Sequence, residues 1–190
     1  MGCKSTKKLV PIVFVCEDIA SGGLKAIHIA KKGDIKATFD VDGAVTFAMA
    51  TEPHSVFDVG DKPFVLVEFN NKDGATKFTD VKTVQATGQS EAIPVITIQL
   101  PKMTKDKRDA LSGYSSPGVE LVALVWTAAD TYQLIGLDFG LYGSEVNGDS
   151  GASRGDLNAY TLTLTGSESH LSRIITDVEY EAALALAVTA

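Results

Sequence analysis

One tetrapeptide in the sequence could belong to a nucleophilic site. Gly148-Asp149-Ser150-Gly151 matches the segment around the reactive serine in one class of serine proteases. Such a serine needs a histidine base and an aspartate that orients the histidine. His54 lies upstream, but its context is Glu-Pro-His-Ser, and Ala152-Ser153 replaces the glycine-proline pair that should follow the tetrapeptide. The residues therefore favour a flexible turn, and we expect that the chain is not an enzyme.

Metal ligands and cofactor motifs are equally weak. Asp40-Val41-Asp42-Gly43 begins like a calcium loop, but the later ligands and the bidentate glutamate are missing. His28, His54 and His170 are scattered without the spacing of a transition-metal site. The sequence also contains no glycine-rich phosphate-binding motif. We therefore expect no metal and no cofactor.

The composition bounds the class of protein. The 190 residues are 45% hydrophobic, and 17 basic residues against 24 acidic ones give a formal charge of −7. An acidic chain is repelled by phosphate, which argues against sequence-specific nucleic-acid binding. No apolar run approaches the roughly 20 residues that span a bilayer, so no membrane partner is expected. Cys3 and Cys16 form no disulfide framework, which suits a reducing cytosol.

The N-terminus reads as a short basic arm. Residues 1–8, Met-Gly-Cys-Lys-Ser-Thr-Lys-Lys, match the pattern for N-myristoylation with a nearby cysteine. The match is short, and a solvated, positively charged arm is the favoured interpretation. The apolar run after it, residues 9–16, is too short for a secretory signal. We expect one β domain over residues 1–190, which includes this arm over residues 1–8 and a long loop over residues 142–156.

Alternation of apolar and polar residues predicts most of the strands. An Asp-Gly turn at Asp42-Gly43 predicts one hairpin, and the polar run Asn70–Gly74 predicts a second hairpin over Phe64–Val84. In that second hairpin, Phe69 and Phe78 would pack together on one face. The predicted strands cover residues 24–30, 35–41, 44–49, 64–69, 76–84, 95–100, 120–126, 131–139 and 160–165.

Helix signals are few. Thr104 to Leu111 has a capping threonine at its start and a glycine just beyond its end, which predicts one short helix. The tail from Thr176 to Ala190 is ambiguous, and its alternation favours a strand that continues from Ile174. Residues 142–156 are rich in Gly, Ser, Asp and Asn and predict a long loop. The fold class is therefore mostly β: a sandwich or barrel of eight to ten strands with one short flanking helix.

Two stretches carry a family resemblance. Residues 21–35, with the Asp42-Gly43 turn that follows, resemble the start of structural proteins of phages that infect Bacteroidetes-type bacteria. Gly148 to Gly166, followed by Glu168, is similar to a run near the end of the same proteins. Ala159 stands where those proteins usually have glycine, and the proline-containing segment that often follows is absent. The two stretches cover about a quarter of the chain, in the order and at the spacing of those proteins.

The resemblance implies a phage tail-tube-type virion protein. In that family a β-sandwich assembles as a hexameric ring, and stacked rings form the conduit for DNA. It implies that the partners are further copies of the chain and other virion proteins, and that assembly into the virion takes place in the host cytoplasm. Six chains at −7 would give a ring 6 × −7 = −42, whose lumen would repel DNA and let it slide.

Two alternatives remain beside the tail tube or neck ring. One is another virion β-protein, such as a head-decoration or connector protein. The other is a ligand- or carbohydrate-binding β-sandwich, although the chain has a single tryptophan and 7% aromatic residues. For the assembly hypothesis, the polar hairpin and the long loop supply the expected inter-subunit contacts. These are Phe69, Lys72, Asp73, Phe78, Asn147, Asp149, Arg154 and Asp156.

Overall fold

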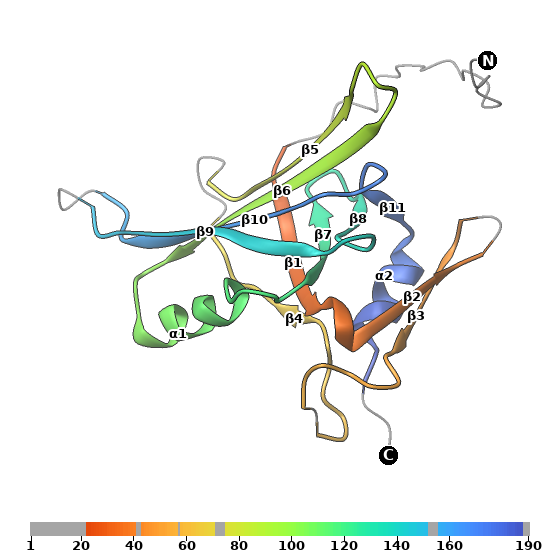
Figure 1. Ribbon diagram of the computed structural model, residues 1–190. Helices are drawn as coiled ribbons and strands as arrows, with labels where there is room; N and C mark the ends of the chain where they lie inside the picture. The colour runs from red at the N-terminus through yellow and green to blue at the C-terminus, as the bar shows by residue number, and fades with distance from the viewer. Residues whose placement is uncertain (1–21, 41–42, 57, 71–74, 152–155, 188–190) are drawn as a thin grey trace.

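The computed structural model describes residues 22–40, 43–56, 58–70, 75–151 and 156–187. Over these residues the protein is mostly β, with a nine-stranded antiparallel sheet, a two-stranded sheet and two short α-helices (Figure 1). No helix among them is long and apolar enough to cross a membrane. The strands are β1 (Leu24–Lys31), β2 (Ile35–Phe39), β3 (Val45–Met49), β4 (Val65–Leu66), β5 (Lys77–Val84), β6 (Ser90–Pro101), β7 (Leu121–Thr127), β8 (Tyr132–Ile135), β9 (Leu141–Asp149), β10 (Ala159–Gly166) and β11 (Arg173–Ile175). The helices are α1 (Lys105–Tyr114), α2 (Asp177–Leu184) and the 3-10 turn η2 (Lys32–Asp34).

The large sheet consists of two halves that meet at one residue pair. The β6 half-sheet has the order β5-β6-β10-β9, and the β7 half-sheet has the order β4-β1-β7-β8-β11. The pair between Leu121 of β7 and Leu141 of β9 joins the halves. In Figure 1 the strands β1 and β7 run across the direction of β6 and β10. The halves therefore form a sandwich joined along one side.

The first hydrophobic core lies between the two half-sheets. Side chains of β1 and β7 meet side chains of β6 and β10, and Leu111 of α1 adds to them. Because side chains alternate between the faces of a strand, every second residue of these strands points into this space. The fully buried members include Ile27, Ile96, Ile98 and Leu164. Each apolar side chain removed from water in this way contributes about 1.5–3 kcal/mol.

The second core lies on the other face of the β7 half-sheet. Val122 and Leu124 of β7 point into it, and it is covered by α2 and by the β2–β3 hairpin. Strand β7, with the sequence Leu-Val-Ala-Leu-Val-Trp-Thr, is buried on both faces, as a continuous apolar run permits. Helix α2 begins with a capping box. The Thr176 hydroxyl accepts a hydrogen bond from the amide of Glu179, and the Glu179 carboxylate accepts one from the amide of Thr176. Glu179 Oε1 also accepts a hydrogen bond from the amide of Val45 at 2.6 Å, which ties α2 to β3.

Two glycines make the close approach of β7, β9 and β10 possible. A Cβ atom on Gly136 would lie 2.6 Å from the carbonyl oxygen of Leu121, and Gly136 has a φ of +86°. A Cβ atom on Gly166 would lie 2.6 Å from the carbonyl oxygen of Gly140. Any larger residue at these positions collides with backbone beside the Leu121–Leu141 pair. The junction between the half-sheets thus depends on glycine.

The structure confirms the fold class and most of the predicted elements. The hairpin through Gly43 forms between β2 and β3, although Asp42 lies outside the described residues. The helix predicted from Thr104 is α1, and the Thr104 hydroxyl accepts a hydrogen bond from the amide of Lys107 at 3.3 Å. The strands predicted near residues 24–30, 95–100, 120–126, 131–139 and 160–165 are β1, β6, β7, β8 and β10.

The predicted hairpin over Phe64–Val84 is wrong. Strand β4 pairs with β1, and β5 pairs with β6 through a turn that contains Gly88, with a φ of +82°. Between them the chain crosses from one half-sheet to the other, since the Val67 amide bonds the carbonyl of Ile27 and the Asn70 amide bonds the carbonyl of Gln99. Local turn residues predict a change of direction, but the partner of a strand is chosen by burial against distant residues.

Two further expectations are corrected. The predicted loop over residues 142–156 is a strand as far as Asp149, because the edge of β10 offers hydrogen bonds to a polar chain that has no apolar pattern. The predicted strand after Ile174 ends at Ile175 and is followed by α2, so two helices rather than one flank the sheets. The Thr-x-x-Glu capping box that begins at Thr176 stabilises the start of α2 and favours a helix over a strand.

Substitution of Gly136 by alanine is expected to destabilise the protein far more than the same change at Gly118. Both glycines have a positive φ, which costs an alanine about 1–2 kcal/mol, but a Cβ atom on Gly118 meets open space. We expect Gly136→Ala to lower the free energy of unfolding by at least about 2 kcal/mol more than Gly118→Ala. Equal losses in urea denaturation would show that the glycine junction is not a constraint.

Candidate assembly interface

The β6 half-sheet has an open edge at β5. Strand β5 pairs with β6 on one side, and no described strand pairs with its other side. Such an edge presents unpaired backbone N–H and C=O groups, which makes it a template for another strand. The β5–β6 hairpin also extends beyond the sandwich (Figure 1), and Val81, Val84 and Ile93 are 58%, 69% and 38% exposed there. Exposed apolar side chains beside an open edge indicate a contact surface.

The opposite edge of the same half-sheet is β9. Its free side meets β7 only at Leu141, and the end of α1 approaches it at Gly143, where a Cβ atom would lie 2.8 Å from the Cα atom of Ser115. The register shifts at this point, so the strand bulges before Glu145. From Glu145 to Asp149 no described strand pairs with that side. The β9–β10 hairpin projects from the sandwich at the other end from the β5–β6 hairpin (Figure 1).

The two open edges carry opposite charges. Lys77 and Lys82 are exposed on β5, and Glu145 and Asp149 are exposed on β9. The acidic residue of β5, Asp80, faces inward instead, and its Oδ2 accepts a hydrogen bond from the Ser172 amide at 2.6 Å. The edge of β5 is therefore basic and the edge of β9 acidic. Charge complementarity of this kind favours one edge meeting the other rather than itself.

The residues predicted from the sequence as assembly contacts fall into three groups. Asn147 and Asp149 are exposed on β9, and Asp156 is exposed at the start of the segment that leads to β10. Phe69 and Phe78 are partly buried and pack against the first core, so they are not available as surface contacts. Lys72, Asp73 and Arg154 lie outside the described residues.

The interface prediction missed the residues that form the two edges. Lys77, Lys82 and Glu145 become candidates only when β5 and β9 are known to be the outer strands of one half-sheet. Alternation of side chains along residues 77–84 is visible in the sequence, but alternation does not reveal which strand lies at an edge. The order of strands in a sheet cannot be predicted from local sequence patterns.

The possible nucleophile has no catalytic partner among the described residues. The Ser150 hydroxyl donates to the carbonyl of Gly151 at 3.4 Å, and the Asp149 carboxylate accepts from the Gly151 amide at 2.8 Å. His54 lies in a different place, with its ring against Gly33 in the segment between β3 and β4. Within the described ranges, no three His, Cys, Asp or Glu side chains are grouped as metal ligands.

One corner of the protein contains a buried carboxylate. Glu168 is 8% exposed, its Oε2 accepts from the Asp138 amide at 2.9 Å, and its Oε1 has no partner among the described residues. Burial, together with the nearby Asp138 carboxylate, raises the pKa of Glu168. The residue also anchors the segment after β10, because its backbone exchanges two hydrogen bonds with Ala92 of β6 at 2.8 Å.

Searches of protein-family models, of curated proteins and of solved structures return no match to this chain.

The stability of the protein is expected to fall as the pH rises through the range in which Glu168 ionises. The pKa of Glu168 is higher in the folded than in the unfolded chain, so the folded state binds the extra proton and is favoured at the lower pH. As the pH rises from the ordinary glutamate pKa of 4.5 through the raised pKa of Glu168, the variant Glu168→Gln should therefore lose less stability than the wild type. Glu52→Gln, at an exposed position, is the control and should follow the wild type. Identical pH profiles for all three proteins in thermal melts would contradict this assignment.

Proposed function

We propose that the chain is a structural protein that assembles with copies of itself into a ring through the open edges of the β6 half-sheet. The observation that carries this proposal is the pair of unpaired edges, β5 and β9, with opposite charge on the two. An edge contact between two different surfaces is head-to-tail, and it forms a ring when the rotation closes. Each copy offers one basic and one acidic edge of the β6 half-sheet, so a closed ring leaves neither of these two edges free.

The strand directions support this mode of assembly. The four strands of the β6 half-sheet alternate in direction, so β5 and β9 run oppositely. Residues 77–84 of β5 are level with residues 90–97 of β6, whereas residues 145–149 of β9 are level with residues 97–101. When the strands are tilted to the ring axis, as in a barrel, rotation about that axis brings β5 of the next copy antiparallel to β9 of the first copy. The antiparallel pattern then continues from copy to copy without interruption. Closure abolishes the edges that would otherwise cause uncontrolled aggregation.

The barrel formed in this way is wide enough to be a conduit. Barrels of about 16–18 strands already leave an aqueous channel, and the diameter grows with the number of strands. Six copies of a four-stranded half-sheet would give 6 × 4 = 24 strands. Six chains, each with a formal net charge of −7, give the ring a net charge of −42. This negative charge opposes adhesion of DNA to the protein. These properties fit the role that the sequence resemblance implies.

We therefore infer a tail-tube-type virion protein whose stacked rings conduct DNA. Its partners are then further copies of the same chain and other virion proteins, and the rings assemble in the host cytoplasm. The role is mechanical and requires neither catalysis nor a cofactor. A head-decoration or connector protein would use the same fold without forming tubes, and electron microscopy separates these roles.

Charge reversal at the two edges tests the proposal. We expect Lys77→Glu/Lys82→Glu to abolish the rings and tubes seen by negative-stain microscopy, because the β5 edge then repels the acidic β9 edge. Glu145→Lys/Asp149→Lys should abolish them as well, and a chain with all four changes should assemble again. Exposed pairs contribute only about 0–1 kcal/mol each, so rescue is expected to be partial.

The matched control is Lys36→Glu/Lys105→Glu, which reverses two exposed charges outside the edges and should leave assembly intact. Thermal melts establish that each variant remains folded. Normal tubes from either two-residue edge variant, or no assembly by the wild type at any salt concentration, would rule out edge pairing of β5 with β9.

A further inference from the structure

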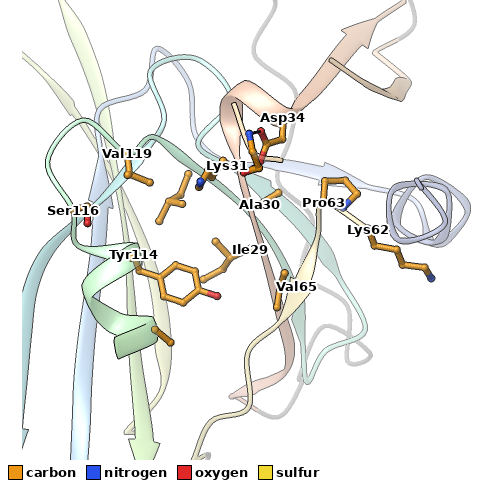
Figure 2. Close-up of a pocket in the computed structure, with 14 residues that line it drawn as sticks. Ile29, Ala30, Lys31, Asp34, Lys62, Pro63, Val65, Tyr114, Ser116 and Val119 are labelled. Carbon is orange, nitrogen blue, oxygen red and sulfur yellow. Dashed lines mark hydrogen bonds between the residues drawn. The ribbon is translucent and has the colours of Figure 1, made fainter. Parts of the chain in front are cut away.

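The open end of the first core contains a pocket of about 460 Å³, which is within the usual range for small-molecule sites (Figure 2). It lies between α1, the end of β1 and the segment that leads into β4. Ile29 and Leu121, which belong to the first core, form its inner wall, and Val65 and Val119 extend the apolar lining outward. The pocket is thus a continuation of the core that α1 covers incompletely.

An exposed lysine and a partly buried tyrosine line this apolar space. Ile29 and Lys31 lie on the same face of β1, so the Lys31 side chain extends over the pocket, and Figure 2 shows its ammonium group on the side of Val119. The ring of Tyr114 crosses the pocket with its hydroxyl beside Ile29. Neither side chain forms a hydrogen bond or ion pair with any described residue.

The one carboxylate in the lining is already satisfied. Asp34 is 2% exposed, and its two oxygens accept hydrogen bonds from the amide and the hydroxyl of Ser55 at 2.8 Å and 2.7 Å. It therefore does not pair with Lys31. A second lysine, Lys62, stands at the rim with its side chain directed away from the pocket (Figure 2). In a chain of net charge −7, the pocket therefore presents one ammonium group, that of Lys31, and one phenol to its occupant.

We propose that this pocket binds a small amphipathic anion, with its apolar body between α1 and β1 and its charged group at the Lys31 ammonium. The apolar walls gain by removal of a hydrocarbon or aromatic body from water. The anion supplies a charge-assisted hydrogen bond to the Lys31 ammonium, which forms no ion pair with a described residue. The site lies outside the β5 and β9 edges and does not depend on assembly.

The test measures binding to the full-length protein by titration calorimetry. Decanoate is the anion, and decanol is its uncharged counterpart. We expect saturable binding of one decanoate per chain. Lys31→Gln should weaken decanoate binding by at least about tenfold, the effect of losing a charge-assisted hydrogen bond, and should leave decanol binding unchanged. Lys36→Gln, at an exposed lysine outside the pocket, is the matched control and should bind both molecules like the wild type.

A second variant tests the apolar part of the site. Ala110 is an exposed residue of α1 that lines the pocket, so Ala110→Trp can fill it without disturbing the core, and it should abolish binding of both molecules. Absence of saturable binding to the wild type, or equal affinities for wild type and Lys31→Gln, would overturn the proposal. So would Lys31-dependent sedimentation with anionic phospholipid vesicles in the absence of decanoate binding, because that result would assign Lys31 to a membrane surface.

Discussion

Strand β7 is buried on both faces, and the arrangement of the other elements depends on this burial. Its alternate side chains enter two separate cores, so β1, β8 and α2 must pack around it while β6 and β10 face it across the first core. Among the described strands, the two halves of the large sheet are joined only by the Leu121–Leu141 pair. Gly136 and Gly166 allow the backbones to approach at that point. Larger residues there would force the two half-sheets apart and open the first core.

The single junction between the half-sheets leaves β9 with an open edge. Because β9 contacts β7 at one residue and then departs from it, most of its outer side is left without a partner strand in the described protein. The β5 edge is open as well, since the chain crosses to the other half-sheet between β4 and β5, and no described strand lies on the free side of β5. A four-stranded unit with two open edges is an incomplete barrel. The proposed ring completes it with copies of the same unit.

The sequence predicts the class of fold well and the connections poorly. Alternation over residues 24–30 and the apolar run of β7 are local patterns, and both appear as strands. Asn70–Gly74 resembles a hairpin turn, yet its flanking strands pair with β1 and β6, which are selected by long-range burial. The residues of the candidate interface are the least predictable part, because they depend on the order of the strands. Phe69 and Phe78 were expected at an interface and instead pack against the first core. Lys77 can be identified as an edge residue only when the order of the strands is known.

Amide hydrogen exchange is the most direct measurement of the central claim, that β5 of one copy pairs with β9 of the next. Exchange would be compared between assembled wild type and the unassembled Lys77→Glu/Lys82→Glu variant. The account predicts that protection on assembly appears in Lys77–Val84 and in residues 145–149, and that the exposed edge strand β11 changes little. Assembly that protects β11 or the segment before β4 and leaves β5 and β9 unchanged would contradict it.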